Sequence, residues 1–304
     1  MLKLRQSNYI LRNMKMNTKR LAVSLMFSLI LLPFGVHASN CKQGESYFKL
    51  AEKASLDDNY EGSKKWSQKA VDACSRFQNW YLLGFSEQKL GNKDQALNAY
   101  KNAHELANGN KENALVIGRF GEVLSIMGER EKALIHLQKA LTLISTAPQW
   151  MTSLAKELDK SLSDKPLTNA QVKRGLSTKR QGLDLMFKDY KPSINIRINF
   201  LLNSTDVDPL SKENLEVLAD ALSNTSYQGQ SFRLVGHTDI RGDDNYNLKL
   251  STSRAEMVKE YLVGINPALE SRLITEGQGE QSPVYKGDEE EDHRLNRRLQ
   301  VMID

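Results

Sequence analysis

The stretch from Gly236 to Val258, GHTDIRGDDNYNLKLSTSRAEMV, changes from a strand pattern to a helix pattern within a few residues. Residues 231–237, SFRLVGH, form an apolar run typical of a buried strand. An acidic loop follows, and apolar residues then recur with helical spacing. We therefore expect a strand that ends at His237, a tight turn, and a helix that begins near Asn245.

The sequence on both sides of this stretch alternates in the same way. We expect further strands over residues 193–200, 272–278 and 299–303, and helices over residues 212–224 and 247–263. Strand-helix-strand alternation predicts right-handed crossovers that place both helices on one side of a shared sheet. The C-terminal region, residues 190–304, is therefore predicted to be one α/β domain with the order βαβαβ-β.

Two side chains of opposite charge are expected at the mouth of this sheet. Asp239 follows the strand, and Arg254 lies on the same helical face as Asn247 because the two are seven residues apart. The ends of strands and the N-termini of helices are where α/β domains bind ligands. A carboxylate beside a guanidinium can bind a zwitterion. Asp239 would accept hydrogen bonds from an ammonium, and Arg254 would form a bidentate contact with a carboxylate.

Four separated blocks of this region resemble one known family. They are GHTDIRG at 236–242, N-x2-LS-x2-RA at 247–255, EGQGEQSP at 276–283 and LNRRLQV at 295–301. In this order and spacing, they resemble the C-terminal peptidoglycan-binding domain of the OmpA-like family, which Pal lipoproteins and flagellar MotB share. The resemblance covers about residues 190–304. Leu201 and Leu202 depart from the family's first strand, where acidic or aromatic residues are frequent.

The resemblance implies a ligand and a set of contact residues. It implies binding to the diaminopimelate of the peptidoglycan stem peptide, which is a zwitterion. Asp239 is implied as the ammonium acceptor and Arg254 as the carboxylate partner. The remaining implied contacts are Thr238, Asn247 and Leu250 as pocket lining, and one of Arg297 and Arg298 as a second cation. Adjacent strand residues face opposite ways, so we expect one of these two arginines, not both, to face the pocket.

The first half of the chain, residues 39–163, is predicted to be an all-α domain of repeats. Three motifs recur at offsets of 33 and 37 residues: Tyr47-x2-Leu50-Ala51, Trp80-x2-Leu83-Gly84 and Ile117-x2-Phe120-Gly121. Each precedes a second motif, Ser63-x3-Ser67-x2-Ala70, Ala96-x3-Tyr100-x2-Ala103 or Ala133-x3-Leu137-x2-Ala140. The pattern resembles tetratricopeptide repeats, in which a W-x2-L-G helix pairs with an A-x3-F helix. Residues 164–189 are expected to be a linker.

The N-terminus has the pattern of a cleaved export signal. A basic start precedes an apolar run from Leu21 to Val36, and residues 36–38 fit a signal peptidase site. We expect residues 1–38 to be removed, with Met14 or Met16 as a possible true start. A retained anchor is the alternative, although the run is shorter than the roughly 20 residues that span a bilayer. The first 38 residues carry six basic and no acidic residues, which leaves 36 basic and 37 acidic residues in the mature chain.

Both cysteines lie beyond the expected cleavage site. Cys41 and Cys74 are 33 residues apart in a chain predicted to enter an oxidising compartment, so we expect them to form a disulfide. The alternative, a lipidated Cys41, lacks a matching lipobox, because Asn40 precedes it, and would leave Cys74 unpaired.

Several classes of function lack the residues they need. The near-neutral mature chain lacks the basic footprint of a nucleic-acid-binding protein. No Ser or Cys lies beside an obvious base in the sequence, and no pair of His has metal-ligand spacing, so we expect no catalysis, metal or cofactor. The acidic run at 288–292 lacks the ligand spacing of a calcium loop and is expected to be a solvated loop.

The sequence therefore predicts a non-catalytic periplasmic protein of the Gram-negative envelope. We expect it to bind peptidoglycan, to present its helical repeats to an unidentified envelope protein, and to associate with the outer membrane at most peripherally. The alternative is an inner-membrane-anchored, MotB-like component of a motor or secretion machine, with an uncleaved leader. A wall-degrading enzyme is a third hypothesis, but no nucleophile or metal set in the sequence supports it.

Overall fold

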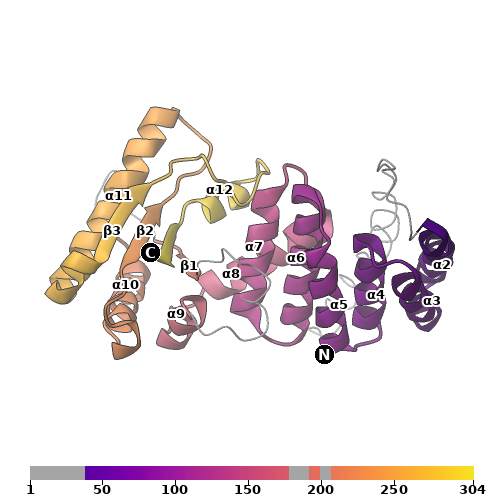
Figure 1. The fold of residues 1–304 in the computed structure, drawn as a ribbon. Coiled ribbons are helices and arrows are strands. Elements are labelled where there is room, and N and C mark those ends of the chain that lie inside the picture. The colour runs from indigo at the N-terminus through magenta and orange to yellow at the C-terminus, as the bar shows by residue number, and fades with distance from the viewer. Residues whose placement is uncertain (1–37, 178–191, 199–206) are drawn as a thin grey trace, which may run out of the picture. The chain divides into compact units, whose positions relative to one another are not determined.

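The computed structural model describes residues 38–177, 192–198 and 207–304 (Figure 1). Residues 1–37 of the predicted leader and Leu201–Leu202 lie outside these ranges. The chain divides into two compact units, Met1–Val123 with Ala147–Ser153, and Leu124–Thr146 with Leu154–Asp304. In the described residues, no helix is both long and apolar enough to cross a membrane. The predicted domain bounds stay a prediction.

The first unit consists of paired helices. Its helices are α2 (Ala38–Leu56), α3 (Tyr60–Ala73), α4 (Phe77–Lys89), α5 (Lys93–Glu105) and most of α6 (Gly109–Ile126). Contacts join α2 to α3, α3 to α4, and α4 to α5. A Cβ at Gly84 would lie 2.7 Å from a ring carbon of Tyr100, so glycine allows α4 and α5 to approach closely. The predicted all-α class is confirmed for this region, and the assignment to tetratricopeptide repeats stays a prediction.

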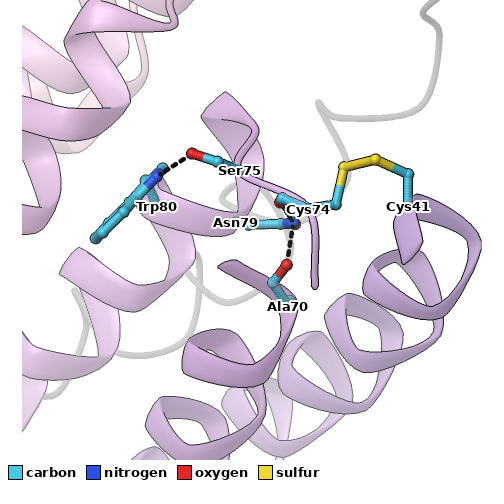
Figure 2. Close-up of a disulfide and its surroundings, with 6 residues drawn as sticks. All are labelled: Cys41, Ala70, Cys74, Ser75, Asn79 and Trp80. Atoms are coloured by element: carbon cyan, nitrogen blue, oxygen red, sulfur yellow. Dashed lines mark hydrogen bonds between the residues drawn. A yellow bond between two sulfur atoms is a disulfide. The ribbon is translucent and has the colours of Figure 1, made fainter. Parts of the chain in front are cut away.

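A disulfide joins the start of α2 to the end of α3. Figure 2 shows Cys41 bonded to Cys74, as the sequence predicted. Beside it, the Asn79 side chain donates hydrogen bonds to the carbonyls of Ala70 (3.0 Å) and Cys74 (2.7 Å). The Ala70 carbonyl lies in the last turn of α3 and also accepts from the Cys74 backbone N–H (2.9 Å), whereas the Cys74 carbonyl lies just past the end of the helix. The connection from α3 to α4 is therefore fixed both covalently and by hydrogen bonds.

Removal of this disulfide by Cys41→Ser with Cys74→Ser is expected to destabilise the helical unit by roughly 3–4 kcal/mol, because the unfolded chain regains the entropy of an open loop. Urea unfolding followed by circular dichroism measures the loss. Reductant should destabilise the wild type by a similar amount and leave the double variant unchanged. Equal unfolding midpoints for wild type and double variant would show that the disulfide contributes nothing.

The second unit contains a four-stranded mixed sheet. Its strands are β1 (Ser193–Ile196), β2 (Phe232–Gly236), β3 (Leu273–Gly277) and β4 (Leu299–Ile303), in the order β1-β4-β2-β3. β4 is antiparallel to β1 and β2, whereas β2 and β3 are parallel. The long helix α11 (Asp244–Ile265) connects the parallel pair and contacts both strands and α10 (Pro209–Leu222) (Figure 1). The predicted α/β class is confirmed.

Apolar residues of these elements form one core. Strand residues Phe232, Leu234 and Val301 are inaccessible to solvent, and they pack with Leu218 of α10 and Leu262 of α11. The short helix α9 (Asn169–Gly175) joins the same core through Val172 and Leu176. Part of the expected linker thus packs on the sheet. Two 3-10 helices, Thr225–Tyr227 and Pro267–Arg272, precede β2 and β3.

Glycines at the ends of β2 and β3 let α11 lie close to the sheet. A Cβ at Gly236 would lie 2.1 Å from the Ser251 carbonyl oxygen, and one at Gly277 would lie 2.5 Å from the Thr252 backbone nitrogen. A side chain at either position would collide with the backbone of α11. This close approach brings the middle of α11 against the ends of the two strands.

Helices α7 (Arg130–Leu143) and α8 (Gln149–Ser163) contribute to the second unit through polar contacts. The Tyr285 hydroxyl donates to Asp159 (2.8 Å), and the Gln138 amide donates to the same carboxylate (2.8 Å). Lys286 donates to the carbonyls of Leu141 and Ile144 at the end of α7. These contacts fix residues 285–286, which lie between β3 and α12 (Glu290–Asn296).

Candidate functional site

The candidate site begins where β2 ends. Backbone hydrogen bonds continue past the strand on both sides, from His237 to the Arg298 carbonyl (3.0 Å) and from Thr238 to the Gly279 carbonyl (2.9 Å). The backbone that precedes Asp239 is therefore held in place by hydrogen bonds on both sides. Helix α11 then begins at Asp244, where the side chain of its N-cap, Asp243, accepts from the Tyr246 backbone.

The Asp239 carboxylate is held by two arginines. One oxygen accepts from the backbone N–H (3.0 Å) and Nε (3.2 Å) of Arg241, and the other accepts from Arg241 Nη2 (2.8 Å) and Arg297 Nη1 (2.6 Å). Burial by itself would raise the pKa of this carboxyl, but the hydrogen bonds from Arg241 and Arg297 outweigh it and hold the pKa well below its usual range. Asp239 is therefore a carboxylate at any pH near neutrality.

Arg254 borders a cationic hollow next to this carboxylate. The lining residues of the hollow are Ile198, Gly236, His237, Arg254, Val258, Arg297, Arg298 and Leu299. Burial and then the charge of Arg297 lower the pKa of Arg254, while Tyr246 and Asp239 act in the opposite direction. Three guanidinium groups at one hollow favour an anion such as a carboxylate.

Arg297 and Arg298 take different partners, although both border the hollow. Arg297 contacts Asp239, whereas Arg298 donates to the carbonyls of Asn296 (3.3 Å) and Ser282 (3.2 Å). Burial lowers the pKa of Arg298 to about 10. From the alternation of side chains along a strand, we expected one of the two arginines to face the pocket. Both precede the first residue of β4, so they are not part of a regular strand and their side chains need not point to opposite faces.

The other predicted contact residues surround the loop between β2 and α11. Asn247 donates to the Arg241 carbonyl (3.0 Å) and to Glu280, so it fastens this loop to the one that follows β3. Thr238 is buried, and its hydroxyl has no hydrogen-bond partner among the described residues. Leu250 is half-buried on α11 and does not line the hollow. The structure thus brings Asp239, Arg254 and Arg297 together at the candidate site.

His237 lies under the site as a buried, neutral side chain. Burial and then the charge of Arg298 lower its pKa to about 3. Among the described residues, no group of three or more His, Cys, Asp or Glu side chains could hold a metal ion.

Two charged residues of the site, Arg241 and Glu290, were not predicted from the sequence. Arg241 donates to Glu290 (2.8 Å) as well as to Asp239, and Arg297 also contacts Glu290 (3.2 Å). Glu290 belongs to the acidic run that was expected to be a solvated loop.

That expectation was correct for Asp288 and Glu289, which are exposed and precede the helix, and wrong from Glu290 onward. The helix α12 begins at Glu290, and a capping box joins Glu289 and Asp292. Asp292 is buried and accepts from Lys156 (2.7 Å). Acidic residues at consecutive positions favour the start of a helix, which is the signal that could have indicated α12.

Comparisons with known proteins match part of the chain. The model of the OmpA family matches residues 199–297. Outer membrane porin F of Pseudomonas fluorescens is 34% identical over 113 residues, which cover 36% of this chain and 33% of that protein. A peptidoglycan-associated lipoprotein of Pseudomonas aeruginosa is 36% identical over 104 residues, which cover 34% of this chain and 58% of that protein. The match thus spans less than two thirds of either relative.

Among solved structures, the peptidoglycan-associated lipoprotein from Burkholderia pseudomallei is 27% identical, with a TM-score of 0.32. The match covers 35% of this chain and 88% of that one. By the match to the family model, the chain carries an OmpA family domain at residues 199–297. A region of paired helices precedes it.

Proposed function

We propose that this protein binds peptidoglycan through the site formed by Asp239, Arg254 and Arg297. The observation that carries the proposal is the cationic hollow beside an ionised, partly covered carboxylate, within a domain of the OmpA family. The name of the similar Pseudomonas aeruginosa lipoprotein, which is peptidoglycan-associated, supports the same ligand.

The ligand group is proposed to be the diaminopimelate of the stem peptide. Its free end carries an ammonium and a carboxylate on one carbon, so it presents opposite charges at close spacing. Asp239 would accept from the ammonium, and Arg254, with Arg297 beside it, would bind the carboxylate. Thr238, Asn247 and Leu250 would support the loop and helix that carry these charges.

No covalent step belongs to this function. We propose a non-catalytic tether in the periplasm that associates with the cell wall and, at most peripherally, with the outer membrane. The paired helices are proposed to bind a protein partner of the envelope. Stacked helix pairs present extended binding surfaces, which supports this second role.

Binding to a defined stem peptide tests the proposal. The protein is expected to bind the tripeptide L-Ala-γ-D-Glu-meso-diaminopimelate in isothermal titration calorimetry. The matched control is the tripeptide with L-lysine at the third position, which keeps the ammonium but lacks the adjacent carboxylate. This control should bind at least about 30-fold more weakly, because the half-buried guanidinium of Arg254 loses its charged partner. Equal affinity for the two peptides would contradict the proposed role of Arg254.

A further inference from the structure

The carboxylate proposed to receive the ligand ammonium already has a full set of donors. Four N–H groups from Arg241 and Arg297 point at its two oxygens at distances of 2.6–3.2 Å. The Asp239 side chain is 10% exposed, so little of its surface remains for another cation. A ligand ammonium can therefore reach this carboxylate only after one guanidinium has moved away.

The two arginines differ in how readily they can move. The Arg241 side chain is 52% exposed and belongs to the loop between β2 and α11, whereas the Arg297 side chain is 33% exposed and directly follows α12. Arg297 also borders the hollow that Arg254 borders. Arg241 donates two guanidinium hydrogen bonds to Asp239 and Arg297 donates one, so the number of bonds does not favour the departure of Arg241. Its greater exposure makes Arg241 the guanidinium that has room to move into solvent.

Glu290 gives Arg241 a second partner outside the site. The Arg241 guanidinium donates hydrogen bonds to Asp239 through Nε and Nη2 and to Glu290 through Nη1. The Glu290 side chain is 67% exposed. When its contact with Asp239 breaks, Arg241 can keep the contact with Glu290 at the solvent edge. The Arg241 guanidinium thus keeps an ion pair after it leaves Asp239, which lowers the free-energy cost of the exchange.

We propose that Arg241 is an internal counter-ion that occupies the ammonium subsite of Asp239 in the empty protein and exchanges with the ligand ammonium on binding. This inference rests on the proposed function. It assigns a selective role to a residue that does not contact the bound ligand. A neutral group cannot replace a guanidinium beside an ionised carboxylate, so a stem peptide without a free ammonium leaves Arg241 in place and binds poorly.

The substitution Arg241→Gln tests this role in the full chain. Without the competing guanidinium, affinity for the diaminopimelate tripeptide should rise about three- to fivefold, the range that an exposed ion pair accounts for. The same tripeptide with its side-chain amine acetylated should bind the variant no more tightly than wild type, because it has no ammonium that could pair with the Asp239 carboxylate. Lys249→Gln, at an exposed position of α11, is the matched control and should leave both affinities unchanged.

The outcomes separate this inference from the proposed function. Unchanged or weaker binding of the tripeptide by the folded Arg241→Gln variant overturns the counter-ion role, and weaker binding would make Arg241 a ligand contact instead. A gain that is equal for the acetylated peptide also overturns it. If neither wild type nor variant binds the tripeptide, the proposed function fails and the inference fails with it. A second readout needs no ligand: carbon-13 NMR should find a higher pKa for the Asp239 carboxyl in Arg241→Gln than in wild type.

Discussion

Asp239→Asn is expected to weaken binding of the diaminopimelate tripeptide by at least about 30-fold. The substitution keeps the shape of the side chain but removes the negative charge, so the ligand ammonium would lose its carboxylate partner and remain beside the guanidinium groups of Arg254 and Arg297. Truncating one partner of a desolvated charge pair typically costs 2–5 kcal/mol. Arg254→Gln should cause a loss of similar size through the ligand carboxylate. Isothermal titration calorimetry measures both.

Matched variants separate a lost contact from a lost fold. Asp244→Asn removes an exposed carboxylate from the first turn of α11, and Lys249→Gln removes an exposed cation from the same helix. Both should bind like wild type. Far-ultraviolet circular dichroism and thermal unfolding should be unchanged for all four variants except for small shifts. Wild-type affinity in the folded Asp239→Asn variant would remove Asp239 from the site.

Gly236→Ala is expected to destabilise the C-terminal unit strongly. The new methyl would lie 2.1 Å from the Ser251 carbonyl oxygen, which is backbone of α11 and cannot rotate away. Overpacking of this kind typically costs 1–3 kcal/mol, and a backbone clash places the expected loss at about 3 kcal/mol. The end of β2 would move away from α11, so tripeptide binding should fall as well.

Gly264→Ala is the matched control for this prediction. Gly264 lies near the end of the same helix, and a methyl there would meet no atom within 4 Å. Alanine favours a helix over glycine by roughly 0.5–1 kcal/mol, so this variant should be as stable as wild type or slightly more stable. Urea unfolding compares the two. Equal midpoints for Gly236→Ala and Gly264→Ala would show that the strand end adapts without cost.

The sequence was sufficient to predict the elements that carry Asp239 and Arg254. The strand over 231–237 and the helix over 247–263 correspond to β2 and α11, because periodic apolar residues report directly on a buried face. The structure extends α11 to Asp244 at its start because the Asp243 side chain caps it. The strand expected over 193–200 ends at Ile196 in the residues described.

Other features depend on contacts between distant residues and could not be predicted. Helix α12 is too short to show a periodic pattern of apolar residues. Its first turn is fixed by an ion pair between Lys156 and the buried Asp292. Likewise, Arg241 was one of many charged residues in the sequence. Arg241 can contact both Asp239 and Glu290 only because the start of β4 lies beside the end of β2.

Co-sedimentation with purified peptidoglycan sacculi tests the central claim most directly. Wild-type protein should pellet with sacculi that contain diaminopimelate, free tripeptide should release it, and Asp239→Asn should stay in the supernatant. If wild type stays in the supernatant, or if the folded Asp239→Asn variant pellets equally well, the site formed by Asp239 and Arg254 does not bind the cell wall.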